Sequence, residues 1–313
     1  MIIFNGNQLA QNREEQLKQR VVSDFTGQKL VIAAVLFKED AGSRLYTKLK
    51  AEAAARVGIG YHSYEFSLSD SIKTIQTKIE ELNNNPDITG IIIQKPWRKT
   101  WVTAQNTQEG IDKNTQREQF AVWWNSLTAT ISQKKDVDGL HPQTIENIKE
   151  GIWQEKGNVL PATCQAVLTI LEEAELQLKN KTNNQNFTKD KYLILGKSDL
   201  LGIPLFYELQ RQEKNVTMLA SEELQERMLS GQKLLDGTVV VSATGRKNLV
   251  TGDMVSQNVV VIDVGEPRGD IEVASVAQKA SFITPVPGGV GPMTVISLLE
   301  NCMQLASRER KYV

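Results

Sequence analysis

Tyr46 and Lys50 are the first residues along the chain whose types and spacing could carry out chemistry. Residues four positions apart share one face of a helix, so the two side chains would lie together. A partly desolvated lysine gives up its proton more readily, and a Tyr–Lys pair can then position and polarise a substrate and transfer protons. The same spacing is common on solvated helices, and the spacing alone favours that simpler interpretation.

Asp136 and Asp138 form a second pair, within the sequence Lys-Asp-Val-Asp-Gly. Two carboxylates two residues apart in a loop could bind a metal ion, a ribose or an amino-heterocycle. Turns whose aspartates both lie in solvent show the same pattern. The spacing alone therefore favours a solvated turn.

Two glycine-containing segments follow predicted strands and are candidates for a phosphate or nucleotide site. In GKSDLLGIP at 196–204, the free N–H groups and the dipole of a helix that begins there would attract phosphate. The segment lacks the G-x-G-x-x-G spacing, so a dinucleotide site and a plain strand-to-helix turn stay equally open. The small residues of SATG at 242–245 would leave room for a ligand, although an ordinary tight turn is the simpler explanation.

The segment TPVPGGVGPMT at 284–294 contains three prolines and three glycines. These residues predict a stiff loop with special dihedral angles, leading into the last predicted helix. Such a pattern is too specific for a simple linker.

The elements that must position these residues form two α/β sets. In the first, short segments predict strands at 29–37, 60–66 and 88–94, and the first and last of these are almost wholly apolar. Helices are expected between the strands at 43–57 and 69–83, which gives a βαβαβ arrangement.

A second set begins near Thr163. Residues 95–134, ahead of it, show no clear pattern apart from a short helix at about 117–127. Four of the five tryptophans lie in this segment, and packing onto the body of the protein is their simplest explanation. In the second set, strands are predicted at 192–196, 216–219, 238–242 and 259–264, and helices at 165–178, 203–212, 222–228 and 294–306.

Length and composition exclude several classes of protein. The 313 residues suit two domains, and 36 Lys and Arg against 37 Asp and Glu argue against a strongly basic nucleic-acid-binding protein. No apolar run approaches the ~20 residues that span a bilayer, and no basic segment precedes an apolar one as in a secretory signal. We therefore expect no nucleic-acid or membrane partner and a cytoplasmic location.

Cysteine and histidine are scarce, which restricts the chemistry further. Two cysteines and two histidines, far apart in sequence, argue against a disulfide framework and against a zinc or other His-based metal site. They also remove most Ser–His and Cys–His nucleophile schemes. Chemistry in this chain must rely on Lys, Tyr, Asp, Glu and Gln, or on a cofactor.

Taken together, the motifs resemble those of the FolD family, the bifunctional methylenetetrahydrofolate dehydrogenase/methenyltetrahydrofolate cyclohydrolases. The resemblance runs from about Phe4 to Ala306. The motifs that carry it are TPVPGGVGPMT, KDVDG followed by LHP at 140–142, S-x-x-Y-x-x-x-K at 43–50, and VIDVG at 261–265 followed by Gly269-Asp270.

The resemblance implies an α/β fold with two domains. A catalytic, folate-binding α/β domain would comprise residues 1–150, completed by the C-terminal helix at 285–313. A Rossmann-like NAD(P)-binding domain would comprise residues 151–284. One-carbon derivatives of tetrahydrofolate would bind in the cleft between the domains, as ligands commonly do in α/β enzymes. A homodimer is implied as well.

The resemblance also assigns roles to four residues of the catalytic domain. Lys50, hydrogen-bonded to Gln94, would be central to cyclohydrolase chemistry by activating or positioning water. Tyr46 would stack on the aromatic parts of the folate, and Asp138 would accept hydrogen bonds from the pterin. The other implied substrate contacts are Ser43, Ile93, Lys95, Pro285, Pro287, Gly288 and Gly289.

The implied cofactor is NADP, with NAD as the alternative, and no metal is expected. In the dehydrogenase half, hydride would pass from the methylene group to the nicotinamide. The residues expected to bind the cofactor are Gly196, Lys197, Ser198, Gly202, Pro204, Ser221, Ala243, Thr244, Gly245, Glu266 and Thr284.

Several residues depart from the family pattern. Lys197 stands where the family has the arginine of Gly-Arg-Ser, and lysine lacks the planar fork that grips a 2′-phosphate. Ala220 replaces a histidine, and the glutamates at 222–223 that follow favour a ribose 2′-OH. Arg98 lies in QKPWR where the family has QLPLP, and Glu266 replaces an apolar residue.

We expect an enzyme that oxidises 5,10-methylenetetrahydrofolate to the methenyl form with NAD(P) and hydrolyses that product to 10-formyltetrahydrofolate. Two alternatives stay open. One is a monofunctional cyclohydrolase with a degenerate cofactor site. The other is a non-catalytic folate- or nucleotide-binding protein whose 95–134 segment docks a partner; in an active enzyme, that segment could cap the cleft or serve an interface.

Overall fold

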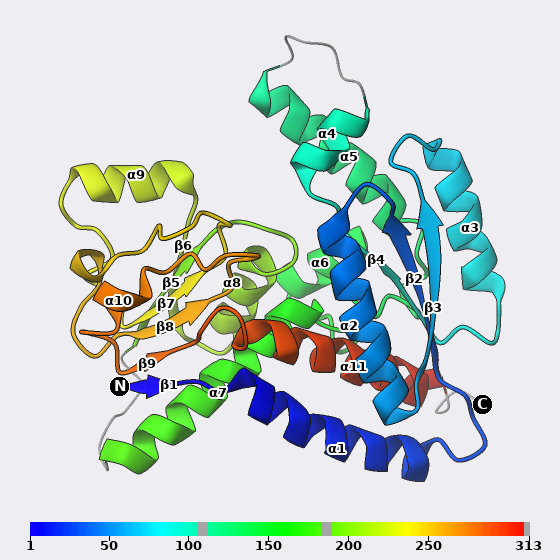
Figure 1. The fold of residues 1–313 in the computed structure, drawn as a ribbon, viewed down its shortest axis with the longest axis horizontal. Helices are drawn as coiled ribbons and strands as arrows, with labels where there is room; N and C mark the ends of the chain where they lie inside the picture. Colours follow the sequence, from blue (N-terminus) through cyan, green and yellow to red (C-terminus); the bar gives the residue numbers. More distant parts are fainter. Residues whose placement is uncertain (106–111, 183–189, 310–313) are drawn as a thin grey trace. The chain divides into compact units, whose positions relative to one another are not determined.

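The chain folds into two compact α/β units, each built on its own parallel sheet (Figure 1). The structure is a computed structural model that describes residues 1–105, 112–182 and 190–309. Met1–Arg13 and Pro161–Ser297 form the six-stranded unit. Glu14–Leu160 and the chain from Leu298 onward form the three-stranded unit. The predicted two-domain α/β class is confirmed.

The sheet of the three-stranded unit has the order β3-β2-β4, with all strands parallel. Its strands are β2 (Val31–Phe37), β3 (Gly60–Phe66) and β4 (Gly90–Ile93), each within or at a segment that the sequence predicted as a strand. Helix α2 (Ala41–Val57) packs against β2 and β3, and α3 (Ile72–Asn84) packs against β4 (Figure 1). The predicted βαβαβ arrangement is therefore confirmed.

Both ends of α2 are fixed by local signals in the sequence. At the start, a carboxylate oxygen of Asp40 accepts hydrogen bonds from the N–H groups of Gly42 and Ser43. At the end, Gly58 adopts a left-handed conformation with φ 85°, and its N–H donates back into the last turn. The helix phase that results turns Ser43, Thr47 and Lys50 towards the protein interior.

The segment 95–134 contains two helices, α4 (Arg98–Ala104) and α5 (Lys113–Thr128). The expected short helix is thus confirmed as part of α5, whereas α4 was not predicted. The rings of Trp101, Phe120 and Trp123 contact one another at centroid distances of 5.5 to 5.8 Å. The ring of Trp123 also lies 5.5 Å from that of Phe37 on β2, and Trp124 is buried, so these residues pack the segment onto its own unit as expected, whereas Trp97 is exposed. Residues 106–111 lie outside the described part.

The sheet of the six-stranded unit has the order β1-β9-β8-β7-β5-β6, again all parallel. Four of its strands lie where the sequence predicted them, while β1 and β9 have two residues each and were not predicted. The bounds are β1 (Ile2–Ile3), β5 (Lys191–Leu195), β6 (Asn215–Leu219), β7 (Val239–Ser242), β8 (Val260–Asp263) and β9 (Phe282–Ile283).

Helices follow the strands of this sheet, as in a doubly wound fold. Helix α8 packs against β5 and β6, and α9 packs against β6. A core of mostly Leu, Val and Ile side chains from β5, β7 and β8 also includes Leu224 of α9 and Val276 of α10. The helices are α7 (Ala162–Thr182), α8 (Gly202–Arg211), α9 (Ser221–Leu229), the short 3-10 helix η2 (Gly252–Met254) and α10 (Val273–Val276).

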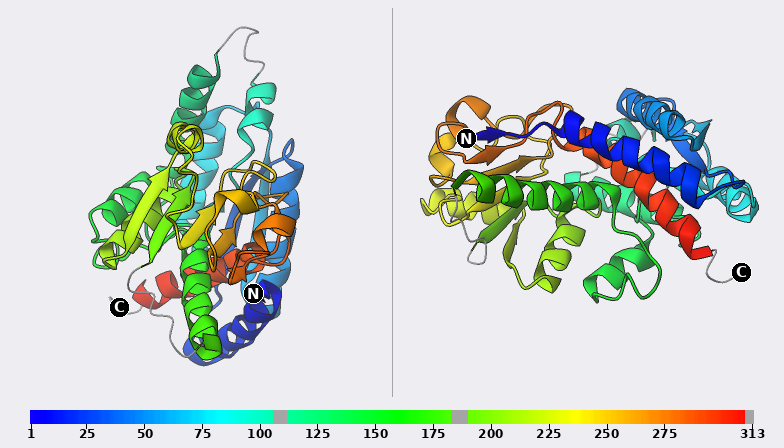
Figure 2. Two further views of the ribbon diagram at one scale, coloured as in Figure 1. Left: turned by 90° about the vertical axis from the view of Figure 1, so that its left-hand side faces the viewer. Right: turned by 90° about the horizontal axis from the view of Figure 1, so that it is seen from below.

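Each of two long helices has its first residues in one unit and its last residues in the other. Helix α1 (Gly6–Asp24) begins in the six-stranded unit, and its first turns lie beside α7 (Figure 2). Helix α11 (Val290–Glu309) also begins there and ends in the three-stranded unit, to which α6 (Pro142–Lys149) belongs as well. No helix within the described residues is both long and apolar enough to span a membrane.

Candidate active site

Lys50 is the best defined candidate for catalysis in the three-stranded unit. Its side chain lies on the inner face of α2 and is only 5% exposed. The Nζ atom donates a hydrogen bond of 2.9 Å to Oε1 of Gln94, the residue that follows β4. The solvated-helix interpretation of the Tyr-Lys spacing is therefore wrong for Lys50, and the Lys50–Gln94 contact implied by the family resemblance is present.

The surroundings of Lys50 change its acidity. Burial lowers the pKa of Lys50, and the nearby negative charge of Asp138 opposes this effect. A lysine with a lowered pKa gives up its proton more readily near neutral pH than one in water.

Tyr46 and Ser43 precede Lys50 on α2. Tyr46 is half-buried one turn before Lys50, and Ser43 is buried at the start of the helix. The Ser43 hydroxyl donates to Oδ2 of Asp40 at 2.7 Å. The structure therefore brings the predicted Ser43, Tyr46 and Lys50 together along one side of α2.

Asp40 joins the helix that carries Lys50 to the loop that carries Gln94. It is 3% exposed, and its Oδ2 atom also accepts the N–H of Trp97 at 3.0 Å. The sequence interpretation missed Asp40, although an aspartate directly before a helix is a known capping signal. Its contacts make it a positioning residue for both elements.

The two aspartates of the KDVDG segment have different environments. Asp136 is 2% exposed, and its carboxylate accepts the N–H groups of Leu140 at 3.2 Å and His141 at 2.8 Å. Burial raises the pKa of Asp136 to about 7. The interpretation as a solvated turn is wrong for Asp136, which holds the loop, whereas Asp138 is partly exposed and acts electrostatically on Lys50.

Two further residues complete this part of the unit and were not predicted. Asn301 of α11 donates from Nδ2 to the carbonyl of Val137 at 2.9 Å and so supports the KDVDG loop. The hydroxyl of Tyr61 on β3 is buried and has no hydrogen-bond partner among the described residues. Burial and the charge of Asp138 raise its pKa. A tyrosine in a strand gives no sequence signal for such a position.

The remaining predicted substrate residues lie in two places. Ile93 is the buried last residue of β4, and Nζ of Lys95 lies 4.8 Å from the ring centre of Trp124. These residues neighbour Gln94 in the three-stranded unit. Pro285, Pro287, Gly288 and Gly289 belong to the six-stranded unit, in the loop between β9 and α11.

In the six-stranded unit, the turn after β5 leaves no room for side chains at two glycines. A Cβ at Gly202 would lie 2.0 Å from the carbonyl oxygen of Gly196, and Gly196 has φ 111°. Helix α8 begins at Gly202, with Pro204 in its first turn, and Ser198 Oγ accepts the Gly202 N–H at 3.4 Å. A tight glycine turn at a helix N-terminus after a parallel strand fits a pyrophosphate.

The loop after β7 is held by a pair of buried aspartates. Oδ2 of Asp270 accepts from the Ser242 hydroxyl at 2.8 Å and from the N–H of Thr244 at 2.6 Å. Asp263 in turn accepts the N–H of Asp270 at 3.0 Å and donates its own N–H to the Thr284 hydroxyl at 2.7 Å. This network fixes Thr244 and Thr284, both predicted cofactor residues, along with the adjacent Ala243 and Gly245.

Glu266 and Ser221 complete the predicted cofactor set. Glu266 follows β8, is partly buried, and has its pKa raised to about 7 by that burial. Ser221 is the first residue of α9, and its hydroxyl accepts a hydrogen bond of 3.1 Å from Nη2 of Arg246. Lys197 forms an ion pair of 2.6 Å with Glu223. Every predicted cofactor residue thus belongs to the six-stranded unit, and several follow the carboxyl ends of its strands.

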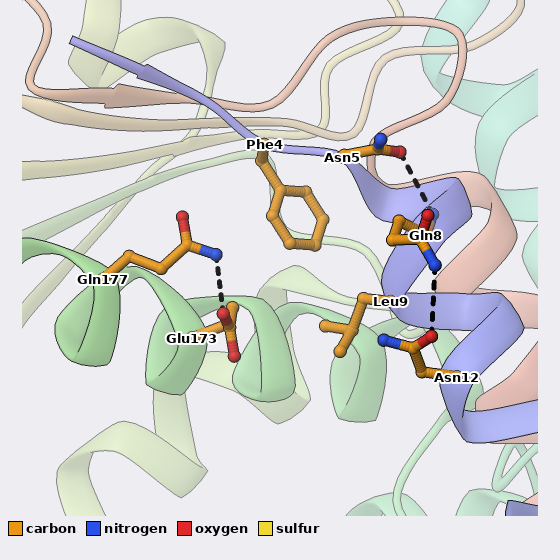
Figure 3. A pocket seen from close by; sticks show the side chains of 7 residues that line it. All are labelled: Phe4, Asn5, Gln8, Leu9, Asn12, Glu173 and Gln177. Atoms are coloured by element: carbon orange, nitrogen blue, oxygen red, sulfur yellow. Dashed lines mark hydrogen bonds between the residues drawn. The ribbon is translucent and has the colours of Figure 1, made fainter.

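A separate cavity of about 160 Å³ lies between α7 and the start of α1 (Figure 3). Its polar side chains already pair with one another: Gln8 donates to Asn12 at 3.1 Å, and Gln177 donates to Glu173 at 2.6 Å. None of the predicted site residues lines it. In the described part of the chain, no group of three or more His, Cys, Asp or Glu residues could hold a metal ion.

A glycine turn at a helix N-terminus beside a parallel sheet, together with a second α/β unit carrying a buried lysine, fits a two-domain enzyme of the nucleotide-dependent dehydrogenase class. Family models agree with this assignment. The model of the tetrahydrofolate dehydrogenase/cyclohydrolase catalytic domain matches residues 4–115, and that of the NAD(P)-binding domain of the same family matches residues 161–310. The chain belongs to the tetrahydrofolate dehydrogenase/cyclohydrolase family.

Individual relatives span the whole chain. It is 32% identical over 321 residues to the bifunctional protein FolD of Nautilia profundicola, with 100% of both chains covered. Its fold is similar to the crystal structure of the bifunctional enzyme FolD from Campylobacter jejuni, with a TM-score of 0.80, 27% identity and 99% of both chains covered. The Trypanosoma brucei enzyme, solved with NADP and an inhibitor, has the same fold (TM-score 0.78, 23% identity, 99% of this chain and 98% of that chain).

Proposed function

We propose that this chain is a bifunctional folate enzyme. It oxidises 5,10-methylenetetrahydrofolate to 5,10-methenyltetrahydrofolate with NAD(P), and it hydrolyses the methenyl product to 10-formyltetrahydrofolate. Membership of the family over both domains supports the two activities together. The observation that carries the proposal is the buried hydrogen bond of 2.9 Å between Lys50 Nζ and Gln94 Oε1.

Hydrolysis of the methenyl group requires proton transfer, which is the role we assign to Lys50. Water adds to the methenyl carbon, and the bond between that carbon and N5 then breaks. The water oxygen gives up two protons in becoming the formyl oxygen; N5 takes one, and the other passes to solvent. Because burial lowers its pKa, Lys50 can accept a proton from the water and return one to N5.

The neighbours of Lys50 receive supporting roles in this proposal. Gln94 orients the lysine through their hydrogen bond. Asp138 accepts hydrogen bonds from the amino-heterocycle of the folate, and the ring of Tyr46 stacks on its aromatic parts. The further folate contacts that we propose are Ser43, Ile93, Lys95, Pro285, Pro287, Gly288 and Gly289.

The nucleotide cofactor, when bound, accepts a hydride from the methylene group. The turn Gly196–Gly202 and the start of α8 would hold its pyrophosphate, since N–H groups and the helix dipole favour an anion there. We propose NADP as the cofactor, with NAD as the alternative. The other residues proposed to hold it are Lys197, Ser198, Pro204, Ser221, Ala243, Thr244, Gly245, Glu266 and Thr284.

Three finer features belong to the proposal on the basis of the family resemblance. In functional terms, residues 1–150 with 285–313 bind folate, and residues 151–284 bind the nucleotide. The enzyme acts as a homodimer. It works in the cytoplasm, where one-carbon derivatives of tetrahydrofolate are its substrates.

A steady-state assay of the purified chain tests the proposal. The substrate is 5,10-methylenetetrahydrofolate with NADP or NAD in parallel reactions, and absorbance follows the formation and decay of the methenyl compound. Turnover with either nucleotide and decay of added methenyl substrate are expected. Hydrolysis without any oxidation would replace the proposal with a monofunctional cyclohydrolase, and absence of both reactions would refute it.

A further inference from the structure

Three charged side chains meet where β6 ends and α9 begins in the six-stranded unit. Nζ of Lys197 lies 2.6 Å from Oε1 of Glu223. The other carboxylate oxygen of Glu223 accepts the N–H of Ala220 at 2.9 Å. From the loop after β7, Nη2 of Arg246 donates to the Ser221 hydroxyl at 3.1 Å. Lys197 lies in the loop after β5, Glu223 in the first turn of α9 after β6, and Arg246 in the loop after β7, so all three follow the carboxyl ends of neighbouring strands.

This edge is the part of a dinucleotide-binding sheet that meets the adenosine ribose. The pyrophosphate binds at the turn after the first strand, and the ribose lies towards the end of the next strand. A carboxylate at that position hydrogen-bonds a free 2′-OH, whereas a cation accommodates a 2′-phosphate. The charges beside Ser221 therefore bear directly on the choice between NAD and NADP.

Lys197 and Arg246 are not equivalent in this group. The positive charge of Lys197 is compensated by Glu223, whose pKa is lowered mainly by that contact. Within the described part of the chain, the Arg246 guanidinium forms no ion pair, and its side chain bonds only to the neutral Ser221 hydroxyl. A guanidinium with free N–H donors can bind two phosphate oxygens at once.

We propose that Arg246 is the residue that selects NADP over NAD, by binding the 2′-phosphate together with the Ser221 hydroxyl. Glu223 weakens the contribution of Lys197 by holding its ammonium group. This inference rests on the proposed function only in requiring that the six-stranded unit bind a nicotinamide dinucleotide. It assigns the cofactor preference to a residue of the loop after β7.

Equilibrium binding to the full chain tests the inference without any turnover. Calorimetry measures the affinity for 2′,5′-ADP and for 5′-AMP, which differ only in the 2′-phosphate, and for NADP and NAD. The wild-type chain should prefer 2′,5′-ADP to 5′-AMP. Arg246→Ala should weaken 2′,5′-ADP binding by roughly tenfold to a hundredfold, the range expected for hydrogen bonds to a charged group, and leave 5′-AMP binding unchanged.

Two further variants sharpen the experiment. Lys247→Ala removes the same charge from the adjacent exposed position of the same loop and should leave both affinities unchanged. Glu223→Gln removes the charge that compensates Lys197 and should strengthen 2′,5′-ADP binding several-fold. Raised salt should reduce the preference for 2′,5′-ADP in the wild type, because exposed charges are screened.

The outcomes distinguish a failure of the role of Arg246 from a failure of the proposed dehydrogenase function. Unchanged 2′,5′-ADP affinity in Arg246→Ala, or an equal loss in Lys247→Ala, would overturn the role of Arg246. Equal wild-type affinity for 2′,5′-ADP and 5′-AMP would overturn it as well. If the wild type binds neither NADP nor NAD, the proposed dehydrogenase function fails, and the inference fails with it.

Discussion

Replacing Lys50 by methionine should abolish hydrolysis of the methenyl compound while leaving the fold and the nucleotide site intact. Proton transfer by a positioned side chain contributes about 10²- to 10⁴-fold to a rate, or about 3 to 5 kcal/mol of barrier. The effect on stability should be small because two changes oppose each other. The lost hydrogen bond to Gln94 costs about 1.5 to 3 kcal/mol, while methionine avoids the desolvation of a buried amine.

The assay follows the decay of added methenyl substrate by absorbance, with binding of NADP and the melting temperature measured on the same protein. Lys48→Met is the matched control, because Lys48 lies on the same helix with a side chain that is 74% exposed. Lys50→Arg separates charge from proton transfer, since arginine keeps the charge but does not release its proton. Hydrolysis at the wild-type rate in Lys50→Met or Lys50→Arg would refute the assigned role.

Three other substitutions test the supporting structure. Asp40→Ala should lower the free energy of unfolding by about 2 kcal/mol in urea titrations, because it removes a helix cap and the contact to Trp97; an unchanged midpoint would contradict this. Burial raises the pKa of Asp136 to about 7, so the folded chain keeps a proton that the unfolded chain releases above about pH 4. As the pH rises from about 4 to 7, the free energy of unfolding of the wild type should therefore fall relative to that of Asp136→Asn, by at most about 4 kcal/mol. If the free energies of unfolding of the two proteins change with pH in parallel, the effect is excluded. Asp270→Asn loosens the contact to Thr244 and should raise the KM for the nucleotide several-fold, whereas hydrolysis of added methenyl substrate should not change; a loss of both activities would indicate general unfolding instead.

The strands could be predicted from sequence where burial leaves a long apolar run. The segments that became β2 and β4 are apolar throughout because both faces of a parallel sheet are covered. Strands β1 and β9 have two residues each, which is too short for any pattern. Helix α4 has seven residues and interrupts an irregular segment, so it gave no periodic signal.

The candidate site was predictable from motifs rather than from spacing. A Tyr and a Lys four residues apart predict an exposed helix as readily as a buried one. The burial of Lys50 depends on where α2 begins, and the Asp40 cap sets that point. The motif TPVPGGVGPMT and the KDVDG segment indicated the family, and the family resemblance predicted the contact between Lys50 and Gln94.

The contacts that the sequence did not reveal join distant segments of the chain, even where the residues belong to a recognised motif, as Asp263 and Asp270 do. Asp263 and Asp270 bind backbone N–H groups and hydroxyls from other loops, and Asn301 supports a loop more than 160 residues earlier in the chain. Arg246, which follows β7, meets Ser221, which follows β6, across the intervening strand β5. Such side-chain contacts follow from the assembled topology and leave no periodicity along the sequence.

The pairing of β1 with β9 has a consequence for how the protein is made. Ile2 pairs with Phe282, so β1 joins a sheet whose adjoining strand is synthesised about 280 residues later. At the usual pace of synthesis this delay is on the order of 15 to 60 s. The β2, β3 and β4 strands have all their partners within the first hundred residues and can pair long before. Among the described strands β1 pairs only with β9, so during translation it stays without this partner until β9 has been synthesised.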